Sequence, residues 1–298
     1  MRVPLTVGGF LRRGAEIYGD RVAVVDEPDT PGSWGTVTYA SLEARARALA
    51  LGLEALGVGI GDRVAIVSPN AARFLAAFFG VSGYGRVLVP VNYRLNADEI
   101  RYIIGHSGAT VLLVDPESDA ALAGVPVEHR IVLDGEADVG LWAEARPGDE
   151  PSRWAEDEDA TASINYTSGT TARPKGVQLT HRNCWVNATT FGWHTAVSDR
   201  DVFLHTLPMF HCNGWGMPYA VTAMGCPQIV IRRIDGEEIL RRVERHGVTL
   251  LCGAPAVVAA VLDAAAARAA RGEAVPGRDR VRLVVAGAPP PSKAVERV

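Results

Sequence analysis

The stretch RVAIVSPNAARFLAAFFGVSGYGRVLVPV, residues 63–91, decides the fold class. Residues 63–68 form a short, almost continuous apolar run that predicts a buried β-strand, and residues 71–79 predict a buried helix. A second apolar run, residues 87–91, predicts the next strand. A strand, a helix and a strand in this order indicate a βαβ unit, whose strands are parallel and covered on both faces.

The same alternation continues on both sides of this unit. Residues 37–39 predict a strand, and Ser41 is expected to cap a helix that ends at Gly57. Further strands are predicted at residues 110–115, 130–134, 162–166, 202–205, 228–231, 248–252 and 281–286, and further helices at residues 97–106, 236–246 and 256–271. The sequence therefore predicts an α/β fold built on mostly parallel strands.

One acidic segment interrupts the alternation. Residues 134–159 contain ten acidic side chains, with Arg146 and Arg153 as the only basic ones. Two prolines, Pro147 and Pro151, lie among them. We expect a solvated connection at the surface.

Length, charge and cysteine usage exclude several classes of protein. The chain has 298 residues, 48% of them hydrophobic, which is enough for a sizeable core and argues against general disorder. A net charge of −4 argues against a nucleic-acid-binding tail or a polybasic membrane patch. No apolar run reaches the roughly 20 residues of a membrane span, and no secretory signal is evident. Four widely spaced cysteines indicate reduced thiols and a cytoplasmic protein.

The segment YTSGTTARPKG, residues 166–176, is the most unusual in the sequence. A predicted strand runs directly into hydroxyl residues around Gly169, and Lys175 follows, one of only two lysines among thirty basic residues. Backbone N–H groups, hydroxyls and one compact ammonium are suited to holding a polyphosphate. The P-loop pattern does not fit, because Lys175 is followed by Gly176 and not by Ser or Thr. A Thr/Ser-rich surface turn is the alternative interpretation.

On these residues the chain resembles the adenylate-forming superfamily of acyl- and aryl-CoA synthetases, peptide-synthetase adenylation domains and beetle luciferases. The phosphate loop of that superfamily is similar to residues 166–176, except at Ala172, where the family most often has glycine. Further similar segments follow in family order at residues 38–42, 56–65, 90–95, 106–109, 207–216 and 286–289. The resemblance covers nearly the whole chain.

The resemblance implies an α/β fold of two packed, mostly parallel sheets with flanking helices, as in the N-terminal domain of this superfamily. One α/β subdomain would span about residues 57–198, and the second would combine residues 1–56 with residues 199–298. The chain stops where a helix opens after a strand. We therefore expect an incomplete N-terminal domain, without the β-barrel part and the C-terminal lid domain, and little activity from this fragment alone.

The superfamily's reaction implies the substrates. A carboxylate attacks the α-phosphate of ATP in the presence of Mg²⁺, which gives an acyl-adenylate and pyrophosphate, and the acyl group then passes to the thiol of CoA. For this chain the resemblance implies ATP, Mg²⁺ and CoA, and a short- to medium-chain fatty acid. We further expect a homodimer. Two alternatives stay open: an inactive nucleotide- or acyl-binding module, and a ligase that transfers the acyl group to an amine or to a carrier-protein thiol.

The resemblance also assigns roles to single residues, position by position. The phosphates would be held by Thr167, Ser168, Gly169, Thr170, Thr171 and Lys175, and Thr167 would also bind Mg²⁺. The adenine would lie against Gly287, Ala288 and Pro289. His211 would be the catalytic candidate and would line the pocket near the carboxylate, and the acyl pocket would be shaped by Asn213, Gly214 and Trp215.

Simpler interpretations stand beside these roles. A histidine among apolar residues is usually a core histidine, and Trp215 would then serve ordinary aromatic packing. A zinc site built from His205, Cys184 and Cys212 is not supported by any ligand spacing.

Overall fold

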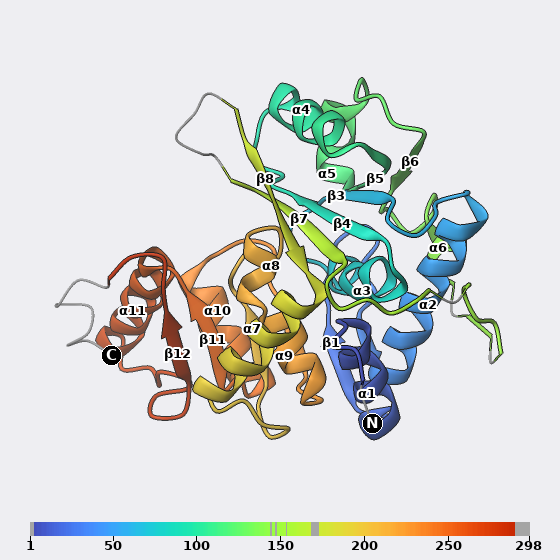
Figure 1. Ribbon diagram of the computed structural model, residues 1–298. Coiled ribbons are helices and arrows are strands. Elements are labelled where there is room, and N and C mark those ends of the chain that lie inside the picture. Colours follow the sequence, from blue (N-terminus) through green and yellow to red (C-terminus); the bar gives the residue numbers. More distant parts are fainter. Residues whose placement is uncertain (1–2, 144, 147, 153, 168–172, 290–298) are drawn as a thin grey trace.

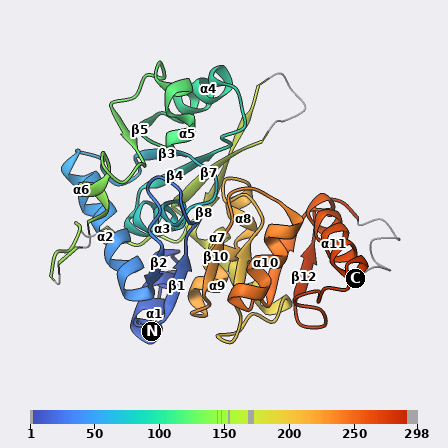
Figure 2. The ribbon, with the colours of Figure 1, turned by 180° about the vertical axis from the view of Figure 1, so that it is seen from behind.

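The computed structural model describes residues 3–289, apart from residues 144, 147, 153 and 168–172. Within this part the chain forms two six-stranded sheets with helices around them, and Figures 1 and 2 show the two sheets from opposite sides. Eight of the ten strand pairs are parallel, and the two antiparallel pairs lie at sheet edges. The predicted fold class, two packed and mostly parallel sheets, is confirmed.

The first sheet contains the βαβ unit of residues 63–91. Its strand order is β6-β5-β3-β4-β7-β8. The strands are β3 (Arg63–Val67), β4 (Val87–Val91), β5 (Ala109–Val114), β6 (His129–Val132), β7 (Thr161–Thr167) and β8 (Lys175–Thr180). Because β8 follows β7 after residues 168–174 and runs antiparallel to it, these two strands form a hairpin.

The second sheet collects strands from both ends of the chain. Its order is β12-β11-β9-β10-β1-β2. The strands are β1 (Val22–Val25), β2 (Thr36–Thr38), β9 (Phe203–His205), β10 (Gln228–Val230), β11 (Leu250–Gly253) and β12 (Arg282–Val285). The N-terminal pair therefore extends a sheet whose other strands come from residues 203–285.

Helices cover the outer faces and fill the space between the sheets. The helices of four or more residues are α1 (Gly8–Tyr18), α2 (Tyr39–Ala55), α3 (Ala72–Gly80), α4 (Ala97–Ser107), α5 (Pro116–Asp119), α6 (Val139–Trp142), α7 (His181–His194), α8 (Cys212–Trp215), α9 (Met217–Ala223), α10 (Gly236–His246) and α11 (Pro255–Ala270). In the two views α4 and α5 lie on the outer side of the first sheet, and α10 and α11 lie beside the second.

The core follows from the alternation of side chains along each strand. In β3, Val64 and Ile66 face a large cluster that includes α3 and residues of both sheets, whereas Ala65 and Val67 face a separate cluster under α4. Every residue of α3 is buried, which explains why this helix is apolar except for Arg73, whose charge is paired with Asp138. A third cluster joins the outer face of the second sheet to α10 and α11.

Polar contacts tie the carboxyl ends of the two sheets together. After β3, the Asn70 side chain donates to the carbonyls of His205 and Leu207, each at 2.9 Å, and accepts a hydrogen bond from the Met209 N–H at 2.8 Å. After β5, Asp115 accepts two hydrogen bonds from Arg232, at 2.9 and 3.0 Å. The loop that follows β9 is therefore held in place by the first sheet.

Two sequence predictions need correction. Thr38, not Ser41, caps α2, because the Thr38 hydroxyl accepts the Ser41 N–H at 3.3 Å. The acidic segment is not solvated throughout. Asp138 is fully buried in an ion pair with Arg73, at 2.5 Å, and Trp142 packs into the core. A carboxylate that meets a buried arginine can leave water, which a count of acidic residues does not reveal.

Candidate functional site

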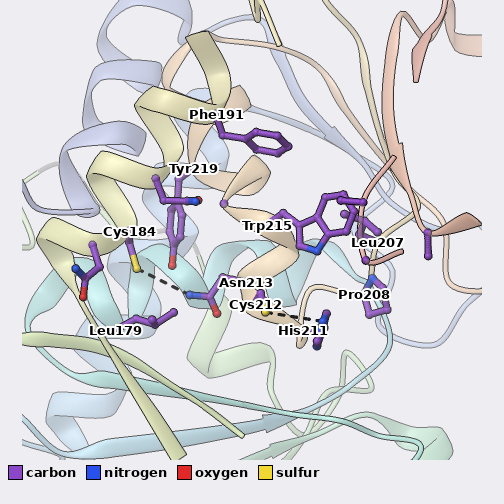
Figure 3. Close-up of a pocket in the computed structure, with 16 residues that line it drawn as sticks. Leu179, Cys184, Phe191, Leu207, Pro208, His211, Cys212, Asn213, Trp215 and Tyr219 are labelled. Atoms are coloured by element: carbon purple, nitrogen blue, oxygen red, sulfur yellow. Dashed lines mark hydrogen bonds between the residues drawn. The ribbon is translucent and has the colours of Figure 1, made fainter. Parts of the chain in front are cut away.

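A cavity of about 680 Å³ lies beside the carboxyl ends of β9, β11 and β12. Ligands of open α/β sheets generally bind at this end of parallel strands. The lining is mostly apolar or aromatic, with three asparagines and one histidine among it. The lining residues are Leu179, Asn183, Cys184, Asn187, Phe191, Leu207, Pro208, His211, Cys212, Asn213, Trp215, Gly216, Tyr219, Ala254, Ala286 and Gly287. Figure 3 shows Phe191, Trp215 and Tyr219 around this space.

The turn at residues 212–216, which includes the short element α8, forms one wall and has a left-handed backbone instead of ordinary helical geometry. All five residues have positive φ, from +47° at Cys212 to +77° at Gly216. A left-handed conformation costs a residue other than glycine roughly 1–2 kcal/mol, and three of the five carry side chains. Such strain persists only where the surroundings hold it, and it is typical of functional sites.

Asn213 contributes hydrogen bonds that keep the turn in this conformation. Its side chain is buried, and its Nδ2 donates to Ser163 Oγ at 2.9 Å, while its Oδ1 accepts from Asn165 Nδ2 at 3.0 Å. Both partners are buried on β7 of the first sheet. The Asn213 amide therefore fixes the turn to the strand that leads into the phosphate-loop segment. Its polar groups are used within the protein.

His211 and Cys212 stand at the exposed side of the same wall. His211 Nε2 lies 3.8 Å from Cys212 Sγ. This contact raises the pKa of His211 above its usual value and lowers the pKa of Cys212. His211 is thus not a core histidine: it is exposed and faces the cavity, where a charged imidazolium could meet a carboxylate.

Trp215 and Gly214 differ in their position relative to the cavity. Trp215 lines it, half-buried, and its ring meets that of Phe191 edge-on with centroids 6.5 Å apart. Gly214 is buried within the turn and packs toward Pro218, so it shapes the wall from behind.

The predicted adenine-binding segment follows β12. Gly287, Ala288 and Pro289 are exposed, and Gly287 lines the cavity with a φ of +92° that favours glycine. Ala288 and Pro289 are not among the cavity-lining residues.

Two of the predicted phosphate-binding residues, Thr167 and Lys175, lie on the β7–β8 hairpin. Thr167 ends β7 and Lys175 begins β8, as register partners, and both are exposed. The hairpin reaches the cavity through Leu179, roughly 13 Å along β8 from Lys175. The other four predicted residues, Ser168, Gly169, Thr170 and Thr171, lie outside the described residues.

Helix α4 supports the stem of this hairpin. His106 Nδ1 lies 2.7 Å from Tyr166 Oη, and Tyr102 Oη donates to the Pro174 carbonyl at 3.5 Å. The Arg173 guanidinium lies over the Tyr102 ring, 5.4 Å from its centroid. The end of β7 and the residues just before β8 therefore both touch α4.

Sequence reasoning missed the lining residues of α7 and α9. Asn183, Cys184, Asn187 and Phe191 come from α7, and Tyr219 comes from α9. The Tyr219 side chain is fully buried, and its hydroxyl has no hydrogen-bond partner. No spacing in the sequence connects these residues with the turn at 212–216.

Two features are absent from the described part of the chain, residues 3–289 with the gaps given above. No group of three His, Cys, Asp or Glu in this part could hold a metal ion. Likewise, no helix in the described part of the chain is long and apolar enough to cross a bilayer. For Mg²⁺, Thr167 offers one hydroxyl oxygen of the hard type that this ion prefers.

Fold and cavity together define a two-sheet α/β protein with a candidate small-molecule site at the carboxyl ends of its strands. A family model described as "AMP-binding enzyme" matches residues 11–298. The chain belongs to the AMP-binding enzyme family.

Two of the relatives with curated descriptions are CoA ligases. The chain is 39% identical over 268 residues to a long-chain-fatty-acid–CoA ligase of Thermus thermophilus, with 87% of this chain and 49% of the relative covered. It is 33% identical over 316 residues to a 2-methylpropanoate–CoA ligase of Humulus lupulus, with 99% of this chain and 54% of the relative covered. The chain thus spans about half the length of these relatives.

Solved structures show the same architecture. The N-terminal domain of FACL13 from Mycobacterium tuberculosis, in an inhibitor-bound crystal structure, is 29% identical and superposes with a TM-score of 0.84, covering 98% of this chain and 72% of that one. The o-succinylbenzoate CoA synthetase of Bacillus subtilis, in complex with AMP, is 27% identical with a TM-score of 0.79, covering 96% and 55%.

Proposed function

We propose that this chain forms the acid- and nucleotide-binding part of an ATP-dependent acyl-CoA ligase. The observation that carries the proposal is the apolar cavity, in which the 211–216 turn and Gly287 converge and which the β7–β8 hairpin borders. The CoA-ligase relatives support it, as do the structures of the Bacillus subtilis synthetase with AMP and with an acyl-adenylate.

In this proposal the acid lies with its hydrocarbon part in the cavity. Leu207, Phe191 and Trp215 offer apolar surface to it, and the carboxylate points to the exposed side, toward His211. Because its pKa is raised by the contact with Cys212, the imidazole of His211 carries positive charge more readily and can orient the carboxylate. It need not act as a base, since the nucleophile is already an anion.

The nucleotide would lie along the rim of the cavity. The adenine would pack on residues 287–289, and Thr167 and Lys175 would hold the phosphates together with Ser168, Gly169, Thr170 and Thr171. One carboxylate oxygen would then attack the α-phosphorus while pyrophosphate leaves on the opposite side. The fixed donors and the Lys175 ammonium would stabilise the negative charge that develops on the phosphate oxygens.

Mg²⁺ would supply neutralisation of the phosphate charge. In the described part of the chain its protein ligand would be Thr167, with the nucleotide providing further oxygens. This division suits an ion that enters bound to ATP.

We propose further that the two sheets mark two subdomains, at about residues 57–198 and residues 1–56 plus 199–298. The acyl substrate would be a short- to medium-chain fatty acid, in line with a cavity volume typical of small-molecule sites. The four free cysteines fit a reducing cytoplasm. A homodimer stays a prediction.

Binding of a non-hydrolysable acyl-adenylate tests the proposal on this chain. Isothermal titration with acyl sulfamoyl adenosines, whose acyl arms have two to twelve carbons, should show affinity that rises with arm length until the cavity is filled. AMP alone should bind more weakly. Equal affinity for AMP and every analogue would contradict an acyl role for the cavity.

Acceptor assays on the complete natural protein that contains this chain separate the alternatives. A CoA ligase forms an acyl-CoA thioester from acid, ATP and CoA. Formation of amide or carrier-protein thioester in place of acyl-CoA would identify the other type of ligase. Analogue binding without any acyl transfer would identify an inactive binding module.

A further inference from the structure

A thiol and an imidazole lie side by side on the cavity wall. Cys212 Sγ is 3.8 Å from His211 Nε2, and Figure 3 shows this contact as a dashed line beside Pro208. Both side chains are exposed. The left-handed backbone at Cys212, with a φ of +47°, is the start of the strained turn. The pair is thus part of a conformation that the protein maintains at a cost.

The other three cysteines, all within the described residues, have a different setting. Cys184, Cys226 and Cys252 are buried, and burial raises the pKa of each thiol to about 12. Cys184 is the informative comparison, because it lines the same cavity, yet its thiol contacts the Asn213 amide, at 4.0 Å, and burial is the main influence on its pKa. A reactive thiol is a partly exposed one beside a positive charge, which describes Cys212.

The space beside the pair can receive a small molecule. The cavity measures about 680 Å³ and is mostly apolar. Tyr219 also lines it, and the hydroxyl of this fully buried side chain has no hydrogen-bond partner. A buried hydroxyl without a partner is costly, and a polar atom of a guest could satisfy it if the neighbouring side chains adjust.

We propose that Cys212, paired with His211, is a covalent modification site for soft carbon electrophiles that fit into the cavity. The thiol proton passes to His211 Nε2, and the sulfur electron pair forms a C–S bond with the electrophilic carbon. The bond from that carbon to the leaving group breaks, and the leaving group departs with its electron pair. With iodoacetamide the C–I bond breaks, and iodide and a carboxamidomethyl thioether result.

Charges around the pair favour this reaction. The hydrogen bond to His211 lowers the pKa of Cys212, and the same contact raises the pKa of His211. The other titratable groups that line the cavity, Cys184 and Tyr219, have raised pKa values because of burial, so they stay neutral near pH 7. The Arg94 guanidinium lies 6.0 Å from the ring of Phe210, the residue before His211. The lowered pKa of Cys212 comes from His211.

Alkylation kinetics test the proposal on the chain itself. The protein is incubated with iodoacetamide between pH 5.5 and 9.5, and peptide mass spectrometry gives the rate at each of the four cysteines. We expect Cys212 to react first, with a pH midpoint below that of N-acetylcysteine in the same buffer. A Cys212→Ser variant should lose this rapid modification.

A His211→Gln variant isolates the role of the imidazole, because glutamine keeps a polar side chain but cannot be protonated. Since a thiolate of lower pKa is also a weaker nucleophile, the benefit of the imidazolium is partly offset. We expect Cys212 in this variant to react about threefold more slowly at pH 7, with a higher pH midpoint. The three buried cysteines should stay unmodified, which shows that the variant is folded.

The results separate this proposal from the ligase proposal, because no readout depends on acid activation. An unchanged rate and pH midpoint in His211→Gln would overturn the pairing. If the buried cysteines react in that variant, the variant has not folded, and the pH dependence of Cys212 alkylation in the wild-type protein then decides whether the proposal holds. A wild-type midpoint at or above that of N-acetylcysteine would then overturn the proposal.

Discussion

Replacing Asn213 by alanine should destabilise the protein by about 3 kcal/mol. The change removes two buried hydrogen bonds, one to Ser163 at 2.9 Å and one from Asn165 at 3.0 Å. Each contributes about 1 kcal/mol net. Alanine must also adopt the left-handed conformation at a φ of +49°, which adds roughly 1 kcal/mol.

A glycine variant separates these contributions. Asn213→Gly loses the same hydrogen bonds but can adopt positive φ freely, so its destabilisation should be about 2 kcal/mol. A Ser163→Ala background provides a second check. There one of the two hydrogen bonds is already missing, and Asn213→Ala should cost about 1 kcal/mol less than in the wild type.

The assay is urea denaturation followed by tryptophan fluorescence, with the free energy of unfolding obtained by linear extrapolation. A loss below 1 kcal/mol for Asn213→Ala would refute the account of how the turn is held. So would an alanine variant that is more stable than the glycine variant, because the left-handed backbone would then carry no cost.

Three further predictions concern the hairpin, the cavity and pH. In the complete natural protein, Lys175→Ala should slow adenylation tenfold to a hundredfold, which corresponds to about 1.5–3 kcal/mol for one lost charged contact to phosphate. Lys175→Arg should restore the rate only in part, and pyrophosphate release measures the rate of both variants. Phe191→Trp should fill the cavity and weaken binding of a twelve-carbon acyl sulfamoyl adenosine more than a four-carbon one, as measured by titration calorimetry. Burial lowers the pKa of His181 and of His205 to about 4, below their unfolded value near 6.5. The stability that these neutral histidines contribute above pH 6.5 should therefore fall as the pH drops toward 4. Urea denaturation midpoints measured across this range check the prediction, and constant midpoints would contradict it.

The regular part of the fold could be predicted from local sequence. The strand at residues 87–91 and the helix at residues 236–246 have the predicted bounds, because apolar runs and flanking glycines mark them. Helix α7 was not predicted, since its fourteen residues, HRNCWVNATTFGWH, follow β8 directly and show little apolar periodicity. Strand β8 was missed because its apolar alternation has only two members, Val177 and Leu179, and the first four residues of the strand are exposed.

Residues of the candidate site could be predicted only where they belong to a sequence motif. Four of the predicted residues, His211, Asn213, Trp215 and Gly287, line one cavity. The bonds from Asn213 to β7 join residues about fifty positions apart, and no local pattern indicates such a pairing. The left-handed turn was not predicted either, because Cys212 and Trp215 belong to residue types that seldom adopt positive φ, whereas Asn213, Gly214 and Gly216 tolerate it.

The central claim, that the cavity places a carboxylic acid for attack on a nucleotide, is tested most directly by pyrophosphate release. The complete natural protein that contains this chain is incubated with ATP and Mg²⁺, with and without octanoate, and released pyrophosphate is measured. The account predicts release that requires the acid, because the carboxylate is the nucleophile. Equal release from ATP alone would indicate a nucleotide hydrolase and contradict the claim.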